Sequence, residues 1–252
     1  MHGSPSLLMP IFDRLASWRT LTDEDREAIV ALPCMLKTLL PGQYLIAEGE
    51  PPKHVCVLKS GFMYRQKIVG NGGRQILAIH VSGDWVDLQH ALLDQADHSV
   101  QALTTAQVVL LPREAVIALA AARPNVALAM WHETLIEASI MREWTANIGR
   151  RPAQVRLAHL LCELLLRLRS AGQSEAQTYE IPMTQEQLGD CTGMTAIHLN
   201  RMLMQLERAG AIARRGRSVK VLDWNRLTQM GDFDPAYLHD LGTARDLGQL
   251  AA

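Results

Sequence analysis

The sequence predicts an α+β protein in which a β-rich roll is followed by one long helix and a winged helix-turn-helix. Three observations favour this fold class. Short β-rich runs broken by turn residues occupy positions 34–111, two apolar stripes follow Pro124, and a doubly capped helical pair begins at Thr184. A chain of 252 residues is long for one compact domain and comfortable for two.

Composition excludes several protein classes. An apolar fraction of 48% is ordinary for a globular chain, and no run of about 20 apolar residues predicts a membrane span. The N-terminus lacks a charged-then-apolar secretory pattern. The four cysteines are scattered without a C-x-x-C pair, which favours a reducing cytoplasm over a disulfide framework or zinc ribbon; they are Cys34, Cys56, Cys162 and Cys191.

The N-terminal part is expected to be helical to about Pro33 and β-rich afterwards. Thr22 and Asp25 form a capping-box pattern that starts a helix. The following runs "QYLIAEG", "HVCVLKSG", "GFMYRQKIV" and "RQILAIHVSG" are bounded by glycine and proline, which favours a small antiparallel barrel or roll. The stretch "DWVDLQHALL" breaks this pattern and predicts a short helix.

A long helix is predicted from Pro124 to about Ile148, because Pro suits a first helical turn. One apolar stripe contains Leu128, Trp131, Leu135, Ala138 and Met141, and a second contains Ile136, Ile140, Trp144 and Ile148. Two stripes predict two buried faces, one on the roll and one on a helix of a second copy. A single intramolecular core is the alternative. The expected dimer interface consists of Leu128, Trp131, Leu135, Ala138, Met141 and Ile148.

The "GRRP" stretch at Gly149 to Pro152 interrupts the helical pattern and predicts a hinge. Beyond it we expect an apolar helix in "AQVRLAHLLCELLLRLRS", a polar linker in "AGQSEAQTYEIP", and one extra helix after Asp232. The predicted domains are a sensor-like β-roll at 1–123, a dimerisation helix with its hinge at 124–151, and a winged helix-turn-helix at 152–252.

The helix-turn-helix prediction depends on caps and glycine spacing. Thr184 and Gln187 form a capping box, and Thr195 caps the second helix, expected at about 196–208. Gly189 permits close helix approach and Gly193 permits the sharp turn. The inward-facing aliphatic residues are Leu188 and Leu199, and Gly210 ends the second helix. Two short strands around Arg215-Gly216-Arg217 then predict a basic wing. The alternative is an αα-corner in a helical enzyme.

Charge on this segment points to an anionic partner. From Ala196 to Lys220 there are six Lys or Arg and one Glu, a local charge of about +5 in a chain whose net charge is −1. We expect Arg201 to donate hydrogen bonds to guanine O6 and N7 in double-stranded DNA. His198 and Asn200 are expected on a base or phosphate and Ile197 on a thymine methyl, while the expected phosphate contacts are Thr195, Arg215, Arg217 and Lys220.

The motifs "MTQEQLGDCTGMTAIHLNRML" and "ARRGRSVKVLDW", with the roll and long helix before them, resemble the Crp–Fnr family of bacterial transcription regulators. The "HLNR" form is similar to an α-proteobacterial subgroup. The resemblance covers nearly the whole chain and implies a cyclic-nucleotide-binding-like roll, a homodimer joined through the long helix, a two-fold-symmetric operator and contact with RNA polymerase. Arg201 matches the family's recognition arginine, but Ile197 stands where an acid is usual.

The effector side departs further from cyclic-nucleotide binders of this family. Their Gly-Glu pair corresponds to Gly83-Asp84, and their Arg-Ser pair to His98-Ser99. Loss of the arginine removes a bidentate phosphate clamp, which argues against cyclic AMP. The residues of a possible effector pocket are Asp84, Asp87, His98 and Ser99.

No cofactor and no metal is expected. Cys34 and Cys56 cannot supply four ligands to an iron–sulfur cluster. Haem would need one of the scattered histidines His80, His90 or His98, which are more commonly structural in such a roll. Oxidation of Cys191, expected in the turn of the helix-turn-helix, would disturb DNA contact, but a small packed side chain is the favoured interpretation.

The sequence leaves two further functions open. One is a metalloenzyme on a cupin-like roll with an incidental helical domain, although the histidines of the roll show no H-x-H spacing and no nucleophile–base motif occurs. We therefore predict no enzyme and no catalytic residue. The other is a regulator that needs no small ligand and responds only to its own abundance.

Overall fold

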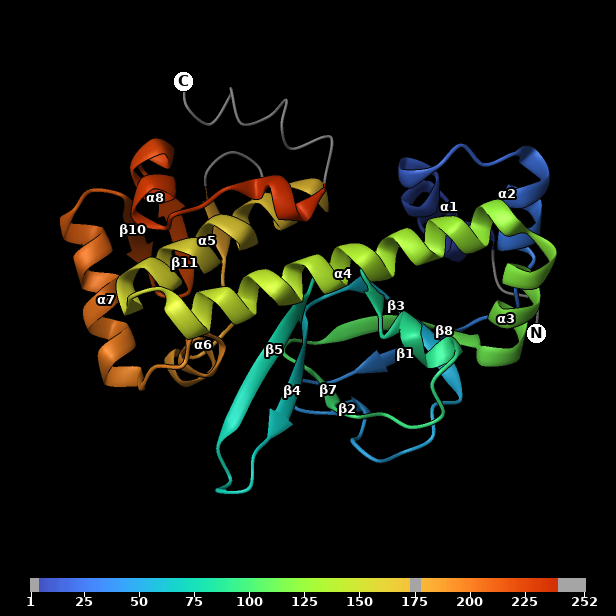
Figure 1. Ribbon diagram of the computed structural model, residues 1–252, viewed down its shortest axis with the longest axis horizontal. Helices are drawn as coiled ribbons and strands as arrows, with labels where there is room; N and C mark the ends of the chain where they lie inside the picture. The colour runs from blue at the N-terminus through green and yellow to red at the C-terminus, as the bar shows by residue number, and fades with distance from the viewer. Residues whose placement is uncertain (1–4, 173–177, 240–252) are drawn as a thin grey trace. The chain divides into compact units, whose positions relative to one another are not determined.

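The computed structural model describes residues 5–172 and 178–239, and its first elements are two short helices (Figure 1). These are α1 (Pro5–Trp18) and α2 (Asp23–Val30). Thr22 accepts from the Asp25 amide while the Asp25 carboxylate accepts from the Thr22 amide, which confirms the predicted capping box.

Eight strands follow and form the predicted roll. They are β1 (Met35–Leu39), β2 (Tyr44–Ile46), β3 (His54–Ser60), β4 (Met63–Ile68), β5 (Arg74–His80), β6 (Trp85–Val86), β7 (Ser99–Ala102) and β8 (Ala106–Pro112). Two four-stranded sheets have the orders β1-β8-β3-β6 and β2-β7-β4-β5. Strand β8 pairs antiparallel with both β1 and β3, so strands distant in sequence are neighbours.

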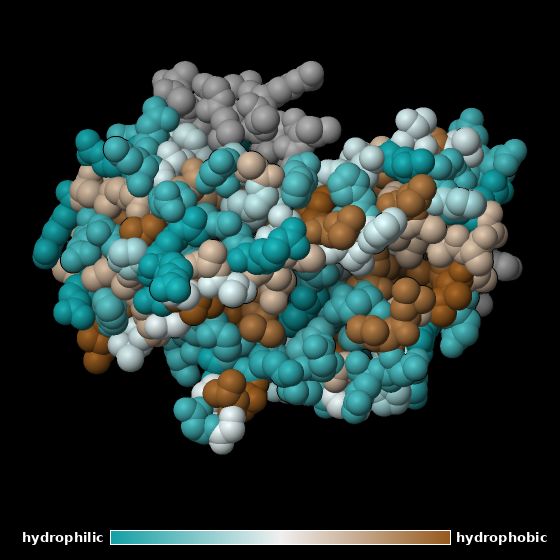
Figure 2. All heavy atoms as spheres, viewed as in Figure 1, coloured by the Kyte–Doolittle hydropathy of each residue, from teal (hydrophilic) through white to brown (hydrophobic). Residues whose placement is uncertain are grey.

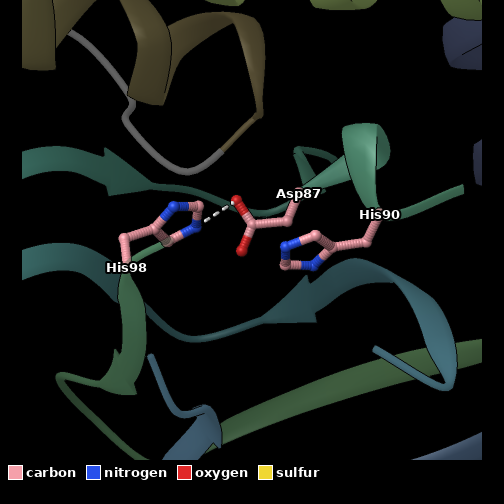
Figure 3. A group of neighbouring side chains, drawn as sticks. All are labelled: Asp87, His90 and His98. Atoms are coloured by element: carbon pink, nitrogen blue, oxygen red, sulfur yellow. Dashed lines mark ion pairs between the residues drawn. The ribbon is translucent and has the colours of Figure 1, made fainter. Parts of the chain in front are cut away.

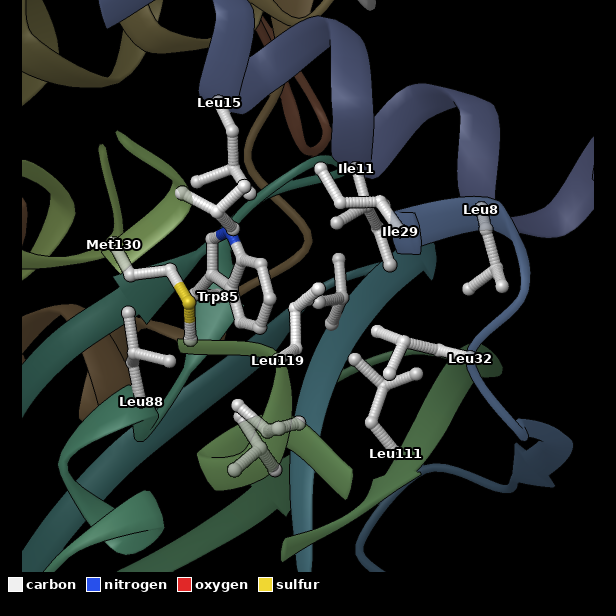
Figure 4. Packing of buried hydrophobic residues seen from close by; sticks show 14 of the residues in the cluster. Leu8, Ile11, Leu15, Ile29, Leu32, Trp85, Leu88, Leu111, Leu119 and Met130 are labelled. Atoms are coloured by element: carbon white, nitrogen blue, oxygen red, sulfur yellow. The ribbon is translucent and has the colours of Figure 1, made fainter. Parts of the chain in front are cut away.

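The sheet that contains β3 and β8 is buried on both faces. Cys56 and Leu58 of β3 belong to a core cluster that also contains residues of β4 and β7 from the other sheet. The alternate residues Val55 and Val57 face a second cluster under α1 and α2 (Figure 4). Side chains alternate between the two faces along a strand, and both faces of β3 pack against apolar clusters. The sequence of β3 therefore lacks a polar–apolar alternation.

The segment "DWVDLQHALL" is less helical than predicted. It consists of strand β6 followed by one 3-10 turn, η1 (Leu88–Ala91). Trp85 and Leu88 are buried in the cluster of Figure 4, so core packing governs this stretch more than helix propensity does. Between the two elements, Asp87 has a positive φ of 60°.

Helix α3 (Arg113–Ala122) leads into α4 (Pro124–Arg150), the predicted long helix. Ile136 and Trp144 of the second stripe are buried. The first stripe is different, because Trp131 is 61% exposed and Leu135 is 51% exposed. Figure 2, which has the same view as Figure 1, shows apolar side chains at the surface along the N-terminal half of α4. One of the two faces predicted to be buried is therefore open in the single chain.

The chain forms two compact units. The boundary on α4 falls between Ala138 and Ser139, and the segment Ile68–Ala78 groups with the C-terminal unit. The helical pattern itself is interrupted later, since α4 ends at Arg150 and the next helix begins at Ala153.

After α4, the described residues of the C-terminal unit form four helices and a small sheet. The helices are α5 (Ala153–Ser170), α6 (Gln185–Thr192), α7 (Ala196–Arg208) and α8 (Trp224–Met230). Strands β9 (Thr178–Glu180), β10 (Ile212–Arg215) and β11 (Ser218–Val221) pair in the order β10-β11-β9. Helix α5 occupies the expected range and packs against α6, α7 and α8, so it is the central element of this core.

Two predictions for the C-terminal unit need correction. The segment predicted as a polar linker contains β9, because Tyr179 is buried and donates a 2.8 Å hydrogen bond to the Leu161 carbonyl. Of the tail after Asp232, where one extra helix is expected, the described residues form only a 3-10 turn, η2 (Pro235–Leu238). The rest of that tail, 240–252, lies outside the described residues, as do 1–4 and 173–177.

Candidate nucleic-acid interface and effector pocket

The helix-turn-helix is held by the residues that predicted it. Thr184 accepts from the Gln187 amide, and the Gln187 side chain accepts from the Thr184 amide. Gly193 ends α6 with a φ of +64°, a conformation that favours glycine. A Cβ on Gly189 would lie within 3.0 Å of the Met194 carbonyl oxygen, so only glycine allows the chain after the turn to pass this closely.

The first turn of α7 presents a polar surface with one apolar side chain. Thr195 caps the helix by accepting from the His198 amide at 3.3 Å. Ile197 is 84% exposed, the highest value among the large exposed apolar side chains of the described residues. Arg201 is exposed and has no ion pair or hydrogen bond among the described residues, so its guanidinium is available to a ligand.

The rear of α7 is core, as its sequence predicts. The buried residues on that side are Leu199, Met202, Leu203 and Leu206. Asn200 is half-buried and lies 3.5 Å from the Gln185 amide nitrogen through its Oδ1. Its position therefore depends in part on α6.

Strands β10 and β11 form the expected wing. Arg215 pairs in register with Ser218, and Gly216 between them has a φ of +62°. Arg215, Arg217 and Lys220 are exposed. Arg214 differs from them because it pairs with Glu207 of α7 at 2.9 Å, so that arginine supports the wing. Three cations of the wing remain at the surface.

The predicted dimer-interface residues lie on α4 with unequal exposure. Leu128, Trp131 and Leu135 are exposed at three- and four-residue spacing. Ala138, Met141 and Ile148 are half-buried. Large apolar side chains open to water at this spacing form a stripe that a partner helix can cover.

The four predicted pocket residues do not form one group. Asp87 and His98 are buried, and His98 Nε2 lies 2.9 Å from Asp87 Oδ1 (Figure 3). Asp84 instead accepts from the Val81 amide at 2.8 Å. The Ser99 hydroxyl accepts from the Glu48 amide at 3.0 Å. The structure thus joins Asp87 with His98, and gives Asp84 and Ser99 backbone partners elsewhere.

Sequence reasoning missed Arg65, which is central to this group. The buried guanidinium of Arg65 pairs with Asp87 and, at 2.5 Å, with Glu137 of α4. Burial opposes the charge of Arg65, but the two carboxylates outweigh it and raise its pKa. Burial likewise opposes the charge of Asp87, yet Arg65 and His98 hold the pKa of that carboxyl well below its usual range. A charged arginine in the middle of the strand-like run "GFMYRQKIV" was the available signal.

His90 is the second residue that the sequence did not connect with Asp87. It lies in η1, is 1% exposed, and stacks on His98 with ring centroids 5.8 Å apart. Burial lowers the pKa of His90, which favours the neutral imidazole. Asp87, His90 and His98 offer ligand atoms within 4.8 Å of one another, whereas the sequence predicts no metal ligands.

The cysteines lie apart from these sites. All four fall within the described part of the chain and none forms a disulfide. Cys191 is buried in α6, one residue before the helix ends, so the expected place in the turn is wrong. Burial raises the pKa of its thiol well above the usual value, which disfavours the reactive thiolate.

Two family models match the two halves of this arrangement. A cyclic nucleotide-binding domain matches residues 36–123, and a Crp-like helix-turn-helix domain matches residues 155–230. Among the described helices, none has the length and apolar character to cross a bilayer.

Known proteins are similar over most of the chain. The transcriptional activator protein anr of Pseudomonas aeruginosa is 25% identical over 81% of this chain and 83% of its own. The fumarate and nitrate reduction regulatory protein of Escherichia coli K12 is 24% identical over 84% of each. The solved structure of FixK2 from Bradyrhizobium japonicum is 26% identical, covers 79% of this chain and 98% of its own, and has a TM-score of 0.74.

The two matched models thus cover the roll and the winged helix-turn-helix, on either side of the long helix α4. The chain belongs to the Crp–Fnr family of bacterial transcription regulators and is a DNA-binding regulator of transcription.

Proposed function

We propose that the first turn of α7 occupies the major groove and that Arg201 donates two hydrogen bonds to a guanine. The observation that supports this most directly is an exposed, unpaired guanidinium on the face of α7 opposite its buried leucines. A bidentate arginine–guanine contact contributes about 1–3 kcal/mol of discrimination. His198 and Asn200 flank this contact as base or phosphate ligands.

Ile197 is expected to change which base pair the half-site requires at one position. An aliphatic side chain that is 84% exposed has no hydrogen bond to offer, so it contacts a thymine methyl or excludes a polar base edge. The family's acid at this position would accept a hydrogen bond from a base. We therefore expect a half-site that differs from the family consensus at the base pair under Ile197.

The wing and the caps position the protein without selecting sequence. Arg215, Arg217 and Lys220 are exposed cations on one small hairpin, and we assign them to phosphates together with the Thr195 hydroxyl. Their loss is expected to weaken binding to all DNA equally and to reduce its salt dependence.

We assign homodimerisation to α4. The assignment is supported by the exposed stripe of Leu128, Trp131 and Leu135, with Ala138, Met141 and Ile148 at its edge. Burial of these three partly exposed apolar side chains in each copy favours association, because it removes apolar surface from water. A two-fold dimer presents two copies of α7, which matches an operator with two half-sites.

The effector is expected to differ from cyclic AMP. Buried side chains of Arg65, Asp87 and His98 already satisfy much of one another's charge within the roll. The His98-Ser99 pair supplies no guanidinium for a cyclic phosphate, and the Ser99 hydroxyl is bonded to the backbone. Neither haem nor an iron–sulfur cluster is proposed. Activity without any small ligand is the second candidate.

A protein with these parts acts on DNA in the cytoplasm, with RNA polymerase as its expected further partner and without enzymatic activity. The cupin-like metalloenzyme is the competing function. A gel shift on genomic DNA with metal-free protein separates the two, since the regulator binds DNA and the enzyme does not. Thermal stabilisation by cyclic nucleotides then tests the effector, because a ligand of the native state raises the melting temperature.

A further inference from the structure

The cluster of Asp87, His90 and His98 has the composition of a transition-metal site. Two imidazoles and one carboxylate are the ligands of many zinc and non-haem iron centres. In Figure 3 the Asp87 carboxylate faces the His98 ring, with the His90 ring beside it. His90 lies in η1, Asp87 directly precedes η1, and His98 directly precedes β7. Two adjacent segments of the roll therefore supply the three side chains.

His90 is the observation that most requires an explanation. It is 1% exposed, and neither ring nitrogen has a hydrogen-bond partner among the described residues. The same is true of Asp87 Oδ2, which lies in the same group. A buried polar group without a partner costs about 1–3 kcal/mol, so a protein rarely retains two of them side by side.

His98 is oriented as a ligand by a second carboxylate. Its Nδ1 lies 2.6 Å from the carboxylate of Asp97, whose side chain is 78% exposed. Nε2 lies 2.9 Å from Asp87 Oδ1, so the His98 ring has a carboxylate on each side. A metal ion at Nε2 would take the place of a proton there, while Nδ1–H still donates to Asp97. A carboxylate behind a histidine is the usual support of a metal ligand.

The surrounding charges can compensate a cation. Arg65 is the positive group at the cluster, and the carboxylates of Asp87 and Glu137 both pair with it. Asp97 adds a third carboxylate on the outer side of His98. If the Asp87 carboxylate coordinates a cation, Arg65 still has Glu137 as an ion-pair partner. The ligand atoms of the three residues lie within 4.8 Å of one another. Tetrahedral coordination of zinc places such atoms about 3.3 Å apart, so binding requires the three side chains to move closer together.

We propose that Asp87, His90 and His98 bind one divalent transition-metal ion of the zinc type, oriented by Asp97. This departs from the expectation of no metal that the sequence alone supports. It also goes beyond DNA binding, since the site lies in the roll.

The test uses the full-length protein, stripped with a chelator and titrated with Zn²⁺, and with Co²⁺ as a spectroscopic probe. We expect one ion per chain, a rise in melting temperature, and cobalt absorption typical of nitrogen and oxygen ligands. His90→Leu and His98→Asn should abolish stoichiometric binding. Asp97→Asn should weaken it about 10–100-fold, the usual effect of losing a carboxylate behind a ligating histidine.

If the His90 and His98 variants fail to fold, Asp97→Asn still tests the proposed metal site, because the Asp97 side chain is exposed. The matched control is Asp94→Asn, an exposed acid nearby that pairs with Arg113 and lies outside the group. Binding that is absent in the wild type, or equal in wild type, Asp97→Asn and His90→Leu, would overturn the proposal. Equal weakening by Asp94→Asn would do the same, since the effect would then be one of general charge.

Discussion

The Met194 amide donates a 2.9 Å hydrogen bond to the Gly189 carbonyl, and the Met194 carbonyl oxygen lies against the face of Gly189 where a side chain would begin. This contact closes the turn between α6 and α7. Because neither backbone segment can withdraw without opening the helix pair, the angle of α7 depends on the missing Cβ.

Gly189→Ala is therefore expected to destabilise the DNA-binding unit by about 1–3 kcal/mol, the usual cost of overpacking, and to weaken DNA binding. Urea unfolding and a gel shift measure the two effects. Gly149→Ala is the matched control: this glycine also lies in a helix, but a Cβ there meets nothing within 4 Å. Since alanine is the better helix former, that variant should be as stable as the wild type or slightly more stable. Equal stability of both variants would show that the turn tolerates a side chain.

Arg201→Ala should reduce affinity for the specific operator about 5–150-fold, which corresponds to 1–3 kcal/mol, while non-specific binding falls much less. Fluorescence anisotropy at several salt concentrations measures both. Arg208→Ala is the control, because this exposed arginine lies in the last turn of the same helix. If the two variants lose the same affinity on specific and random DNA, Arg201 acts only through its charge.

Trp131→Glu and Leu135→Glu should each convert the dimer to monomers, since a buried unpaired carboxylate is costly at an apolar interface. Sedimentation velocity reports the change, and circular dichroism verifies that the fold persists. Leu92→Glu places the same charge on another exposed leucine, outside α4, and should leave the dimer intact. A dimer that survives both α4 substitutions would place the interface elsewhere.

Stability is expected to decrease as pH falls from about 7 to 5, in part because of His159. This residue is buried, its Nδ1 lies 3.1 Å from the Gly231 carbonyl, and burial together with Arg151 lowers its pKa despite Glu163 and Glu143 nearby. The unfolded chain then binds a proton below about pH 6.5 that the native state resists, so the stabilisation present above that pH is lost below it. His159→Gln should show a flatter decline in urea unfolding between pH 7 and 5. A slope equal to that of the wild type would exclude this contribution.

Local patterns predicted the elements whose causes are local. Thr184 and Gln187 lie three residues apart, Gly189 meets Met194 only five residues later, and Gly193 ends α6 through its own φ, so the helix-turn-helix followed from the sequence. The stripes of α4 also follow from helical period alone. Strand β9 could not be predicted in this way, because Tyr179 is extended by its pairing with Val219, forty residues later.

The polar group in the roll was missed for the same reason. Arg65, Asp87 and Glu137 come from a strand, a left-handed residue and a distant helix, and only the fold brings their charges together. His90 resembled a structural histidine in the sequence, since nothing in its neighbours indicates that both ring nitrogens are left without partners in the described structure.

Selection of bound sequences from a random DNA library tests the central claim most directly, namely that the first turn of α7 contacts base edges from a two-fold dimer. We predict enrichment of a palindrome whose half-sites are centred about 10 base pairs apart, with a guanine in each half that Arg201→Ala no longer selects. A library that remains random after selection with folded, dimeric protein would contradict the claim. So would a palindrome that Arg201→Ala selects unchanged.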